Sequence, residues 1–236
     1  SLTGRSMLQV RKELEETYGK YDLRTEIKAM SKVPLAFEPG EHFLYGFGHD
    51  LVAGLIEVVS GKSVGQFMKE EIFEPLGMTS TGYRHFGDTR DRMAVVYTKT
   101  PEGVLYPSPN QFDATHEPDA VYEGGGAGLF STVRDYLRFT QMLACGGQWK
   151  GQKIIGRHTI NLMRRDQLTP AQKQENFHGC YLDGYGYGLG VRTMVDPAFG
   201  TSNSPVGEFG WTGVLGTWTS IYPEEQFSAV YMHQMD

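Results

Sequence analysis

Hydrophobic residues recur at intervals of three and four along the first third of the chain, which is the spacing of a helix with one buried face. Over residues 6–18 this stripe consists of Met7, Val10, Leu14 and Tyr18. A second short helix is predicted over residues 22–32. It must end before Pro34, because proline disfavours helical backbone at the preceding residue.

Two more helices are predicted before residue 76. Asp50 is a good N-cap for the first and Gly61 closes it. The residues of this helix that we expect to face inward are Leu51, Val52, Leu55, Ile56 and Val59. Ser63 and Gln66 form a capping box for the next helix, which is predicted to stop at Pro75. Ser63 also occupies a Gly-x-Ser-x-Gly sequence, but a nucleophile elbow needs a strand before the serine, so we interpret Ser63 as a cap.

The second half of the chain changes from helices to strands. Residues 90–122 are predicted as a hairpin or irregular β excursion, and strong helices over residues 132–145 and 157–165 follow. The predicted strands near the C-terminus read YGYGLGVRTM, GEFGW, GTWTSIYP and FSAVYMHQ. Short connections between strands imply antiparallel pairing. We therefore predict an α+β fold, with a mainly helical region over residues 1–180 packed on an antiparallel sheet portion over residues 181–236.

Composition narrows the function classes. A net charge of −6 over 236 residues gives no clustered excess of Lys and Arg, so we expect no nucleic-acid partner. No apolar run approaches the roughly 18–20 residues that cross a bilayer, so we expect no membrane partner. The chain carries no targeting segment, which leaves both a cytoplasmic and an exported location open. Cys145 and Cys180 can pair or stay reduced, and their spacing argues against a cysteine-ligated zinc site.

Glycine is unusually frequent, with 30 residues, and its positions indicate turns and sites. The run from Gly124 to Gly128 precedes a helix but lacks the order of a phosphate-binding loop, so we expect a tight turn that lines a cleft. The seven histidines form no ligand pair on one element, so we predict neither a metal nor another cofactor.

Several stretches in order along the chain point to one family. They read FEPGEHFLY, IEVVSGKS, EEIFEPLGMTSTGY, EGGGAGLFSTVRDYLRFTQML, YGYGLGV and GWTGVLGTWTSIYPEEQFSAVYM. Together they resemble the family of serine β-lactamases and penicillin-binding proteins, and more closely its class C-related branch of esterases and transesterases. The resemblance covers nearly the whole chain and implies a β-lactamase/transpeptidase-like fold.

In that family, a serine and a lysine three residues apart on a buried helix act with a tyrosine and with a Lys/His/Trp-x-Gly element on the sheet edge. By motif position, the resemblance implies that Tyr45 is the catalytic tyrosine and that the Val214 backbone N–H is an oxyanion-hole donor. It also implies that Trp211, Thr212 and Gly213 bind substrate.

Two departures from the family pattern bear on the substrate. The family's Tyr-x-Asn is here Tyr45-Gly46-Phe47, and a phenyl ring at Phe47 cannot make the hydrogen bonds of an amide. Trp211 stands where lactamases carry lysine, so the site offers no cation for a β-lactam carboxylate. We therefore expect a carboxylesterase acting on small neutral esters through an acyl-serine. The alternatives are a β-lactamase, a D,D-peptidase or acyl transferase acting on an amide or ester, and an inactive β-lactamase-like binding module.

A third departure concerns the nucleophile. No Ser-x-x-Lys occurs in these 236 residues, and the family's first strands and last helix are also missing. We therefore interpret the chain as a truncated part of a longer serine hydrolase, with an incomplete sheet. Apolar sheet residues left uncovered would favour a homo-oligomer or a complementing chain, and we place Phe209, Val214, Trp218, Ile221, Val230 and Met232 on that surface.

Overall fold

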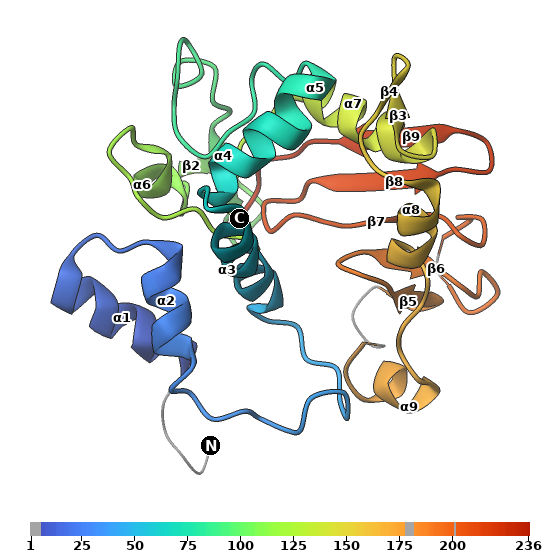
Figure 1. Ribbon diagram of the computed structural model, residues 1–236, viewed down its shortest axis with the longest axis horizontal. Coiled ribbons are helices and arrows are strands. Elements are labelled where there is room, and N and C mark those ends of the chain that lie inside the picture. The colour runs from blue at the N-terminus through green and yellow to red at the C-terminus, as the bar shows by residue number, and fades with distance from the viewer. Residues whose placement is uncertain (1–5, 178–181, 201) are drawn as a thin grey trace.

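The computed structural model describes residues 6–177, 182–200 and 202–236, so Cys180 lies outside the described residues. The chain begins with a helical hairpin of α1 (Met7–Tyr18) and α2 (Leu23–Met30), which lies to one side of the body in Figure 1. Ser6 and Gln9 form a capping box on α1, and Asp22 caps α2. Both helices agree with the sequence prediction to within two residues.

Helix α3 (Gly48–Ser60) forms in the predicted region and Gly61 closes it, but the predicted N-cap is wrong, because the helix begins before Asp50, which lies in its first turn. The predicted buried face is also wrong. Leu51, Val52, Leu55 and Val59 are 47, 55, 61 and 80% exposed. The buried side of α3 consists instead of small and acidic residues: Asp50, Ala53, Gly54 and Glu57. Gly54 allows α2 to approach closely, because a Cβ there would lie 2.0 Å from the Ile27 side chain.

The rest of the helical part runs from residue 64 through a β excursion to a long helix. One helical run contains α4 (Val64–Met68), the π-helix η1 (Lys69–Phe73) and α5 (Glu74–Leu76), and it passes the predicted stop at Pro75 by one residue. Pro75 lies in the last turn of this run, and Gly77 closes it with a left-handed backbone conformation. The excursion contains the hairpin of β1 (Val96–Lys99) and β2 (Leu105–Ser108) followed by α6 (Asp113–His116).

Five antiparallel strands form the main sheet in the order in which they occur along the chain. They are β5 (Tyr185–Tyr187), β6 (Arg192–Met194), β7 (Phe209–Gly210), β8 (Trp218–Tyr222) and β9 (Phe227–Tyr231). The first predicted strand is thus a hairpin of two strands, because Gly188 and Gly190 turn the chain in its middle. A mixed α+β architecture with an antiparallel C-terminal sheet agrees with the predicted fold class.

Helices α7 (Val133–Ala144) and α8 (Arg157–Met163) cover one side of this sheet (Figure 1). Their apolar residues share one core with residues 73–78 and with Phe209 and Ile221 of the sheet, both almost fully buried. Two residues expected on an open sheet surface therefore lie in the core instead. The solvent-exposed apolar residues of the sheet are instead found at every second position of β9, where Phe227 and Tyr231 are 55 and 59% exposed. Between α7 and α8 lies the small hairpin of β3 (Gln148–Trp149) and β4 (Gln152–Lys153), and α9 (Pro170–Gln172) and the π-helix η2 (Lys173–Phe177) follow α8.

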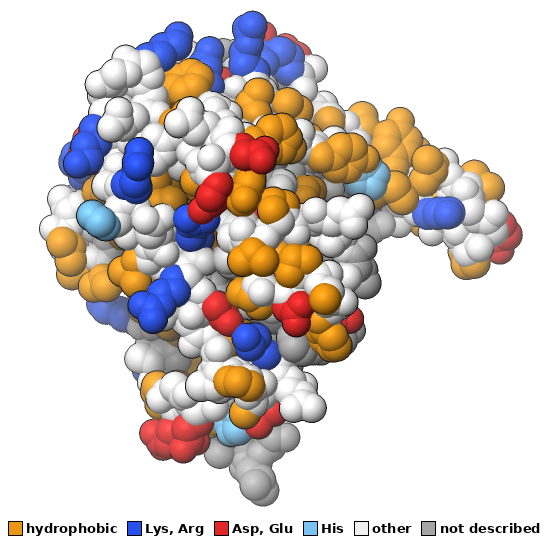
Figure 2. All heavy atoms as spheres, turned by 90° about the vertical axis from the view of Figure 1, so that its right-hand side faces the viewer, with side chains coloured by type: hydrophobic (Ala, Val, Ile, Leu, Met, Phe, Trp, Pro, Cys, Tyr) orange, Lys and Arg blue, Asp and Glu red, His pale blue; other side chains and the backbone are white. Residues whose placement is uncertain are grey.

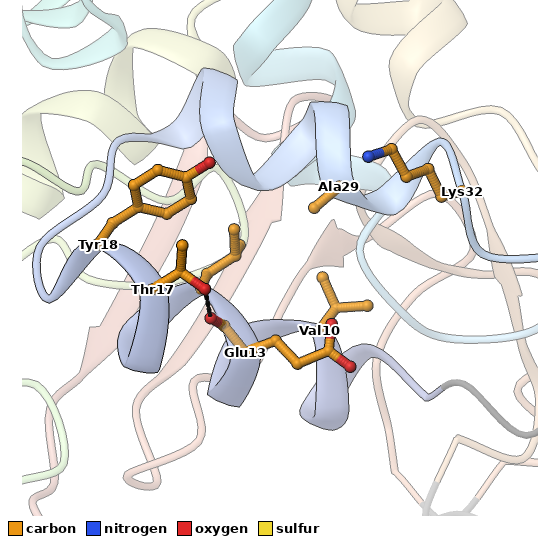
Figure 3. A pocket seen from close by; sticks show the side chains of 7 residues that line it. Val10, Glu13, Thr17, Tyr18, Ala29 and Lys32 are labelled. Carbon is orange, nitrogen blue, oxygen red and sulfur yellow. Dashed lines mark hydrogen bonds between the residues drawn. The ribbon is translucent and has the colours of Figure 1, made fainter.

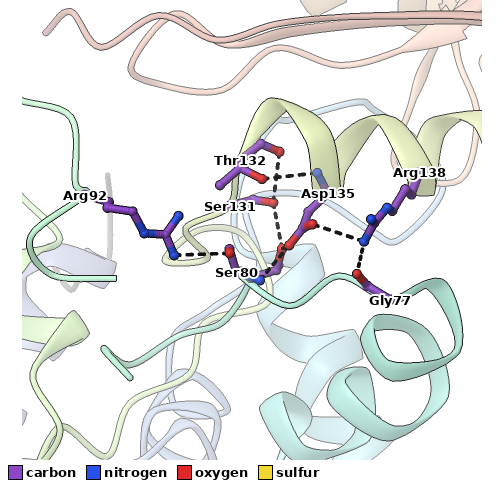
Figure 4. Close-up of polar contacts among 8 residues, drawn as sticks. Gly77, Ser80, Arg92, Ser131, Thr132, Asp135 and Arg138 are labelled. Atoms are coloured by element: carbon purple, nitrogen blue, oxygen red, sulfur yellow. Dashed lines mark hydrogen bonds and ion pairs between the residues drawn. The ribbon is translucent and has the colours of Figure 1, made fainter. Parts of the chain in front are cut away.

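Buried Asp135 in the first turn of α7 ties this helix to the end of α5 (Figure 4). Its carboxylate accepts hydrogen bonds from the Ser80 backbone N–H at 2.7 Å and from the Thr81 hydroxyl at 3.2 Å. Arg138, one turn further along α7, donates to the Gly77 carbonyl oxygen. These contacts attach the helical part to the layer that covers the sheet.

A buried ion pair lies within the sheet. Arg192 on β6 is fully buried, and its guanidinium donates to Glu208 at 3.1 Å and to the Thr219 carbonyl oxygen at 2.9 Å. The same guanidinium lies 3.8 Å from the centroid of the Trp218 ring. Burial raises the pKa of Glu208, an effect that the charge of Arg192 opposes. Arg192 therefore favours the ionised form of this buried carboxylate.

Surface features give no sign of a dominant charged or apolar face on the side drawn in Figure 2, where both signs of charge are interspersed with hydrophobic side chains. No single described helix is long and apolar enough to cross a membrane; α3 with residues 64–76 meets the length and composition requirement only as a pair bent by 80°.

Candidate active site

Tyr45 lies on the extended segment that leads into α3, and its ring stacks on Trp211 of the sheet. The two ring centroids are 5.8 Å apart and the ring planes differ by 13°. His49, the second residue of α3, lies beside Gly190 in the β5–β6 turn, since a Cβ on Gly190 would lie 2.6 Å from the His49 Nε2. This packing places the segment against the sheet. The structure thus brings together two predicted site residues that are 166 positions apart in the sequence.

Trp211 is held at the end of β7 by its backbone. The Thr219 N–H donates to the Trp211 carbonyl oxygen at 3.0 Å, and the Trp211 N–H donates to the Thr219 hydroxyl at 3.2 Å. The next residue, Thr212, forms an antiparallel bridge with Trp218. Trp211 and Thr212 therefore continue the line of β7 along the edge of β8.

A tight turn follows at Gly213, whose N–H donates to the Thr217 carbonyl oxygen at 2.9 Å. A Cβ at this position would lie 2.2 Å from the Thr217 hydroxyl, so a larger residue here would force the Thr217 side chain to move. Val214 lies at the tip with its side chain 65% exposed, and its N–H has no backbone acceptor among the described residues. This N–H is therefore available to a ligand, as an oxyanion donor must be.

Two aromatic residues that the sequence analysis did not select complete the surroundings of Trp211. Tyr187, the last residue of β5, approaches Trp211 edge-on with ring centroids 5.5 Å apart. Phe43, two residues before Tyr45, lies 5.0 Å from the Tyr187 ring centroid. Burial raises the pKa of Tyr187, and the negative charge of an ionised Tyr45 adds to this effect. In the sequence, only the repeated tyrosines of YGYG could have pointed to Tyr187 as a residue of this site.

Phe47 faces a different neighbour. The Arg11 guanidinium of α1 lies 4.7 Å from the Phe47 ring centroid, within range of a cation–π interaction. Two hydrogen bonds to buried Glu26 neutralise this arginine. The predicted role of Phe47 in substrate binding stays a prediction, as do the roles of Tyr45, Thr212, Gly213 and Val214.

The glycine run packs on the first turn of α3, directly after Tyr45. Asp50 accepts hydrogen bonds from the Gly125 N–H at 3.0 Å and from the Tyr122 hydroxyl at 3.2 Å. A Cβ at Gly125 would lie 2.0 Å from the His49 carbonyl oxygen, so this approach requires glycine. The chain bends at residues 125–127, and the run packs against the start of the helix that follows Tyr45. That the run lines a cleft stays a prediction.

The far end of the glycine run depends on a buried histidine that the sequence analysis passed over. His116 at the end of α6 is 3% exposed, and its Nε2 lies 3.0 Å from the Gly128 carbonyl oxygen, to which it donates. Burial lowers the pKa of His116 and the charge of His85 adds to this effect, whereas the hydrogen bond to Gly128 and the charge of Asp113 oppose it. Folding therefore favours the neutral form of the His116 imidazole over the protonated form.

We expect stability to fall as the pH drops through about 6.5, the ordinary histidine pKa. Because the pKa of His116 is lowered on folding, the unfolded chain binds the proton more tightly, so acid favours unfolding. Urea denaturation at pH 7.5 and 5.5 measures this effect, and His116→Gln should show a shallower pH dependence. The exposed His158 on α8 provides the control, since His158→Gln should keep the original slope. A His116→Gln slope equal to that of the unmodified chain would contradict this assignment.

Other hollows of the described surface lie apart from these residues. A hollow of about 210 Å³ lies between α1 and α2, with Val10, Glu13 and Lys32 among its lining (Figure 3). Another, of about 410 Å³, lies beside Cys145, Arg157 and Glu224. Within the described ranges, no three His, Cys, Asp or Glu side chains converge as a metal site requires.

Comparison with known proteins identifies the family and the fold. The sequence model of the Beta-lactamase family matches residues 7–236. An uncharacterized protein of Mycobacterium tuberculosis is 30% identical over 214 residues, which are 88% of this chain and 52% of that protein. A putative D-alanyl-D-alanine carboxypeptidase of Escherichia coli is 26% identical over 220 residues, which are 87% of this chain and 48% of that protein.

The fold is similar to that of EstCE1, described as a hydrolase with promiscuous acyltransferase activity. The TM-score is 0.76 at 22% identity, and the match covers 91% of this chain and 57% of EstCE1. The chain spans about half the length of the curated relatives that it matches. With a family match over residues 7–236 and this fold, the chain belongs to the Beta-lactamase family.

Proposed function

We propose that this chain supplies the tyrosine and the oxyanion strand of a serine hydrolase that cleaves small neutral esters through an acyl-serine. One observation carries the proposal: Tyr45 stacks on Trp211, three residues before the exposed Val214 turn. A proton acceptor and an oxyanion donor are the two groups that acyl transfer needs beside a nucleophile.

The proposed reaction begins when a serine hydroxyl gives its proton to the ionised Tyr45 oxygen and the serine oxygen attacks the ester carbonyl carbon. The resulting oxyanion accepts a hydrogen bond from the Val214 N–H. Its collapse breaks the ester C–O bond, and Tyr45 returns the proton to the leaving alkoxide. Water then attacks the acyl-serine by the same route and releases the acid.

The nucleophile belongs, in this proposal, to a helix that packs on α3. No Ser-x-x-Lys occurs in residues 1–236. The exposed stripe of Leu51, Leu55 and Val58 runs along α3 at helical spacing and starts six residues after Tyr45. Burying such a stripe against a second helix would stabilise both and would place a serine and a lysine beside the tyrosine. The lysine cation would then favour the phenolate form of the tyrosine.

The lining favours an uncharged substrate. Trp211 presents an apolar face and Phe47 an aromatic ring, while the nearby Arg11 is already paired with Glu26. A carboxylate on the substrate would find no unpaired cation among these residues. Neutral esters should therefore be turned over in preference to penicillins.

A fluorophosphonate probe followed by intact-protein mass spectrometry tests the proposal. We expect no adduct on residues 1–236 alone, and one adduct on the complete polypeptide, meaning the translation product in which these residues occur. Peptide mapping should place that adduct on a serine of a Ser-x-x-Lys outside residues 1–236. A stable adduct on a serine within them would contradict the assignment of the nucleophile. A complete polypeptide without any adduct would favour the inactive binding module.

A further inference from the structure

The ring of Tyr187 lies between Phe43, two residues before Tyr45, and Trp211, on which Tyr45 stacks. Its ring meets Trp211 edge-on, with centroids 5.5 Å apart and planes at 79°. On its other side it meets Phe43, with centroids 5.0 Å apart. Tyr45 occupies the face of the Trp211 indole, so Tyr187 is in a position to set the orientation of that face.

The backbone of Tyr187 is fixed by contacts that do not involve Tyr45. Its N–H donates to the Asp166 carboxylate at 3.2 Å, and its carbonyl oxygen accepts from the Gln167 N–H at 2.8 Å. Lys173 in turn pairs with Asp166 at 2.8 Å. The residues after α8 therefore hold the end of β5, and the Tyr187 ring projects from a rigid support.

We propose that Tyr187 is a positioning residue of this site, whose ring, braced by Phe43, holds the Trp211 indole in the orientation on which Tyr45 stacks. The proposal rests on the proposed function, because orientation of Tyr45 matters only if Tyr45 moves a proton. Both tyrosines contact the same indole, Tyr45 on its face and Tyr187 at its edge. These ring contacts carry the proposed role.

Fluorine NMR of the chain labelled with 5-fluorotryptophan tests the structural half of the proposal. The chain contains three tryptophans, Trp149, Trp211 and Trp218, so three resonances are expected, and Trp211→Phe assigns one of them. Tyr187→Leu should shift and broaden the Trp211 resonance, because the edge-on ring is lost. Tyr187→Phe should leave it in place, because the ring is kept. Unchanged Trp149 and Trp218 resonances show that the variant is folded.

Phe43→Leu gives an independent variant if Tyr187→Leu does not fold, and it should shift the same resonance by removing the brace. Kinetics of the complete polypeptide test the functional half. Tyr187→Leu should lower kcat by about 10- to 100-fold with little change in KM, since misplacement of a catalytic group by about 1 Å has effects of this size. Tyr187→Phe should stay within about twofold of the unmodified enzyme.

An unshifted Trp211 resonance in Tyr187→Leu would overturn the proposal, and so would a Tyr187→Phe variant as impaired as Tyr187→Leu. A shifted resonance in a polypeptide without hydrolase activity would leave the positioning of Trp211 by Tyr187 supported while refuting the proposed function. The two failures are therefore distinguishable.

Discussion

Replacing Tyr45 with phenylalanine should lower kcat for hydrolysis of a p-nitrophenyl ester by about 10²- to 10⁴-fold in the complete polypeptide, the usual contribution of a general acid–base group. Phenylalanine keeps the ring that stacks on Trp211, so KM should change little. Only the hydroxyl is removed, and with it the group proposed to accept the serine proton. Steady-state kinetics with p-nitrophenyl butyrate measure both constants.

Tyr18 offers a matched control for this variant. Tyr18 and Tyr45 are each 62% exposed, but Tyr18 lies on α1 in the hollow between α1 and α2 (Figure 3). Tyr18→Phe should leave both kinetic constants unchanged. Turnover by Tyr45→Phe equal to that of the unmodified enzyme would refute the assignment of Tyr45 as the base.

Removing Arg192 should destabilise the fold by about 3–5 kcal/mol at neutral pH, the effect expected when one partner of a buried ion pair is lost. Arg192→Ala leaves Glu208 buried without its charged partner and also removes the hydrogen bond to the Thr219 carbonyl oxygen. Chemical denaturation of the chain at pH 7.5 measures the loss. Arg90→Ala, which breaks an exposed pair with Glu117, should change stability far less, because solvent screens that pair.

The loss caused by Arg192→Ala should also depend on pH in a defined direction. Burial raises the pKa of Glu208, and without Arg192 only hydrogen bonds with Ser220 and Tyr185 oppose that increase. A carboxyl group whose pKa is raised on folding stabilises the fold most when it is protonated. The loss of stability in Arg192→Ala should therefore shrink as the pH falls from 7.5 toward about 4.3, the ordinary glutamate pKa. A deficit that grows on acidification would contradict the buried pair as its cause.

Local signals predicted much of the secondary structure. Ser63 caps a helix as predicted, and Ser6, Asp22 and Thr132 cap helices that were predicted to start at these positions, since a side-chain oxygen that accepts from the first turn acts within four residues. The two strands over residues 185–194 were predicted as one because the turn between them is only a few residues long. The missed β3–β4 hairpin consists of two-residue strands, which are too short to show alternation.

The buried face of α3 shows why a periodic pattern was insufficient there. The helix has two sides that could be buried: an aliphatic stripe, and a side of small residues with Asp50 and Glu57. In this structure the second side is covered, because Gly54 admits α2 and Asp50 binds the glycine run. Hydrophobic periodicity indicates a helix but does not say which partners are present to cover it.

The sequence by itself determined the helices with strong caps, the antiparallel C-terminal strands, and the motif order that marks the Beta-lactamase family, because these depend on neighbouring residues or on fixed spacings. Only the tertiary structure decided that Tyr45 stacks on Trp211, that Tyr187 braces the same indole, and that His116 binds Gly128. These contacts join segments far apart in the chain, and their geometry follows from how helices and sheet pack together. No local pattern encodes that packing.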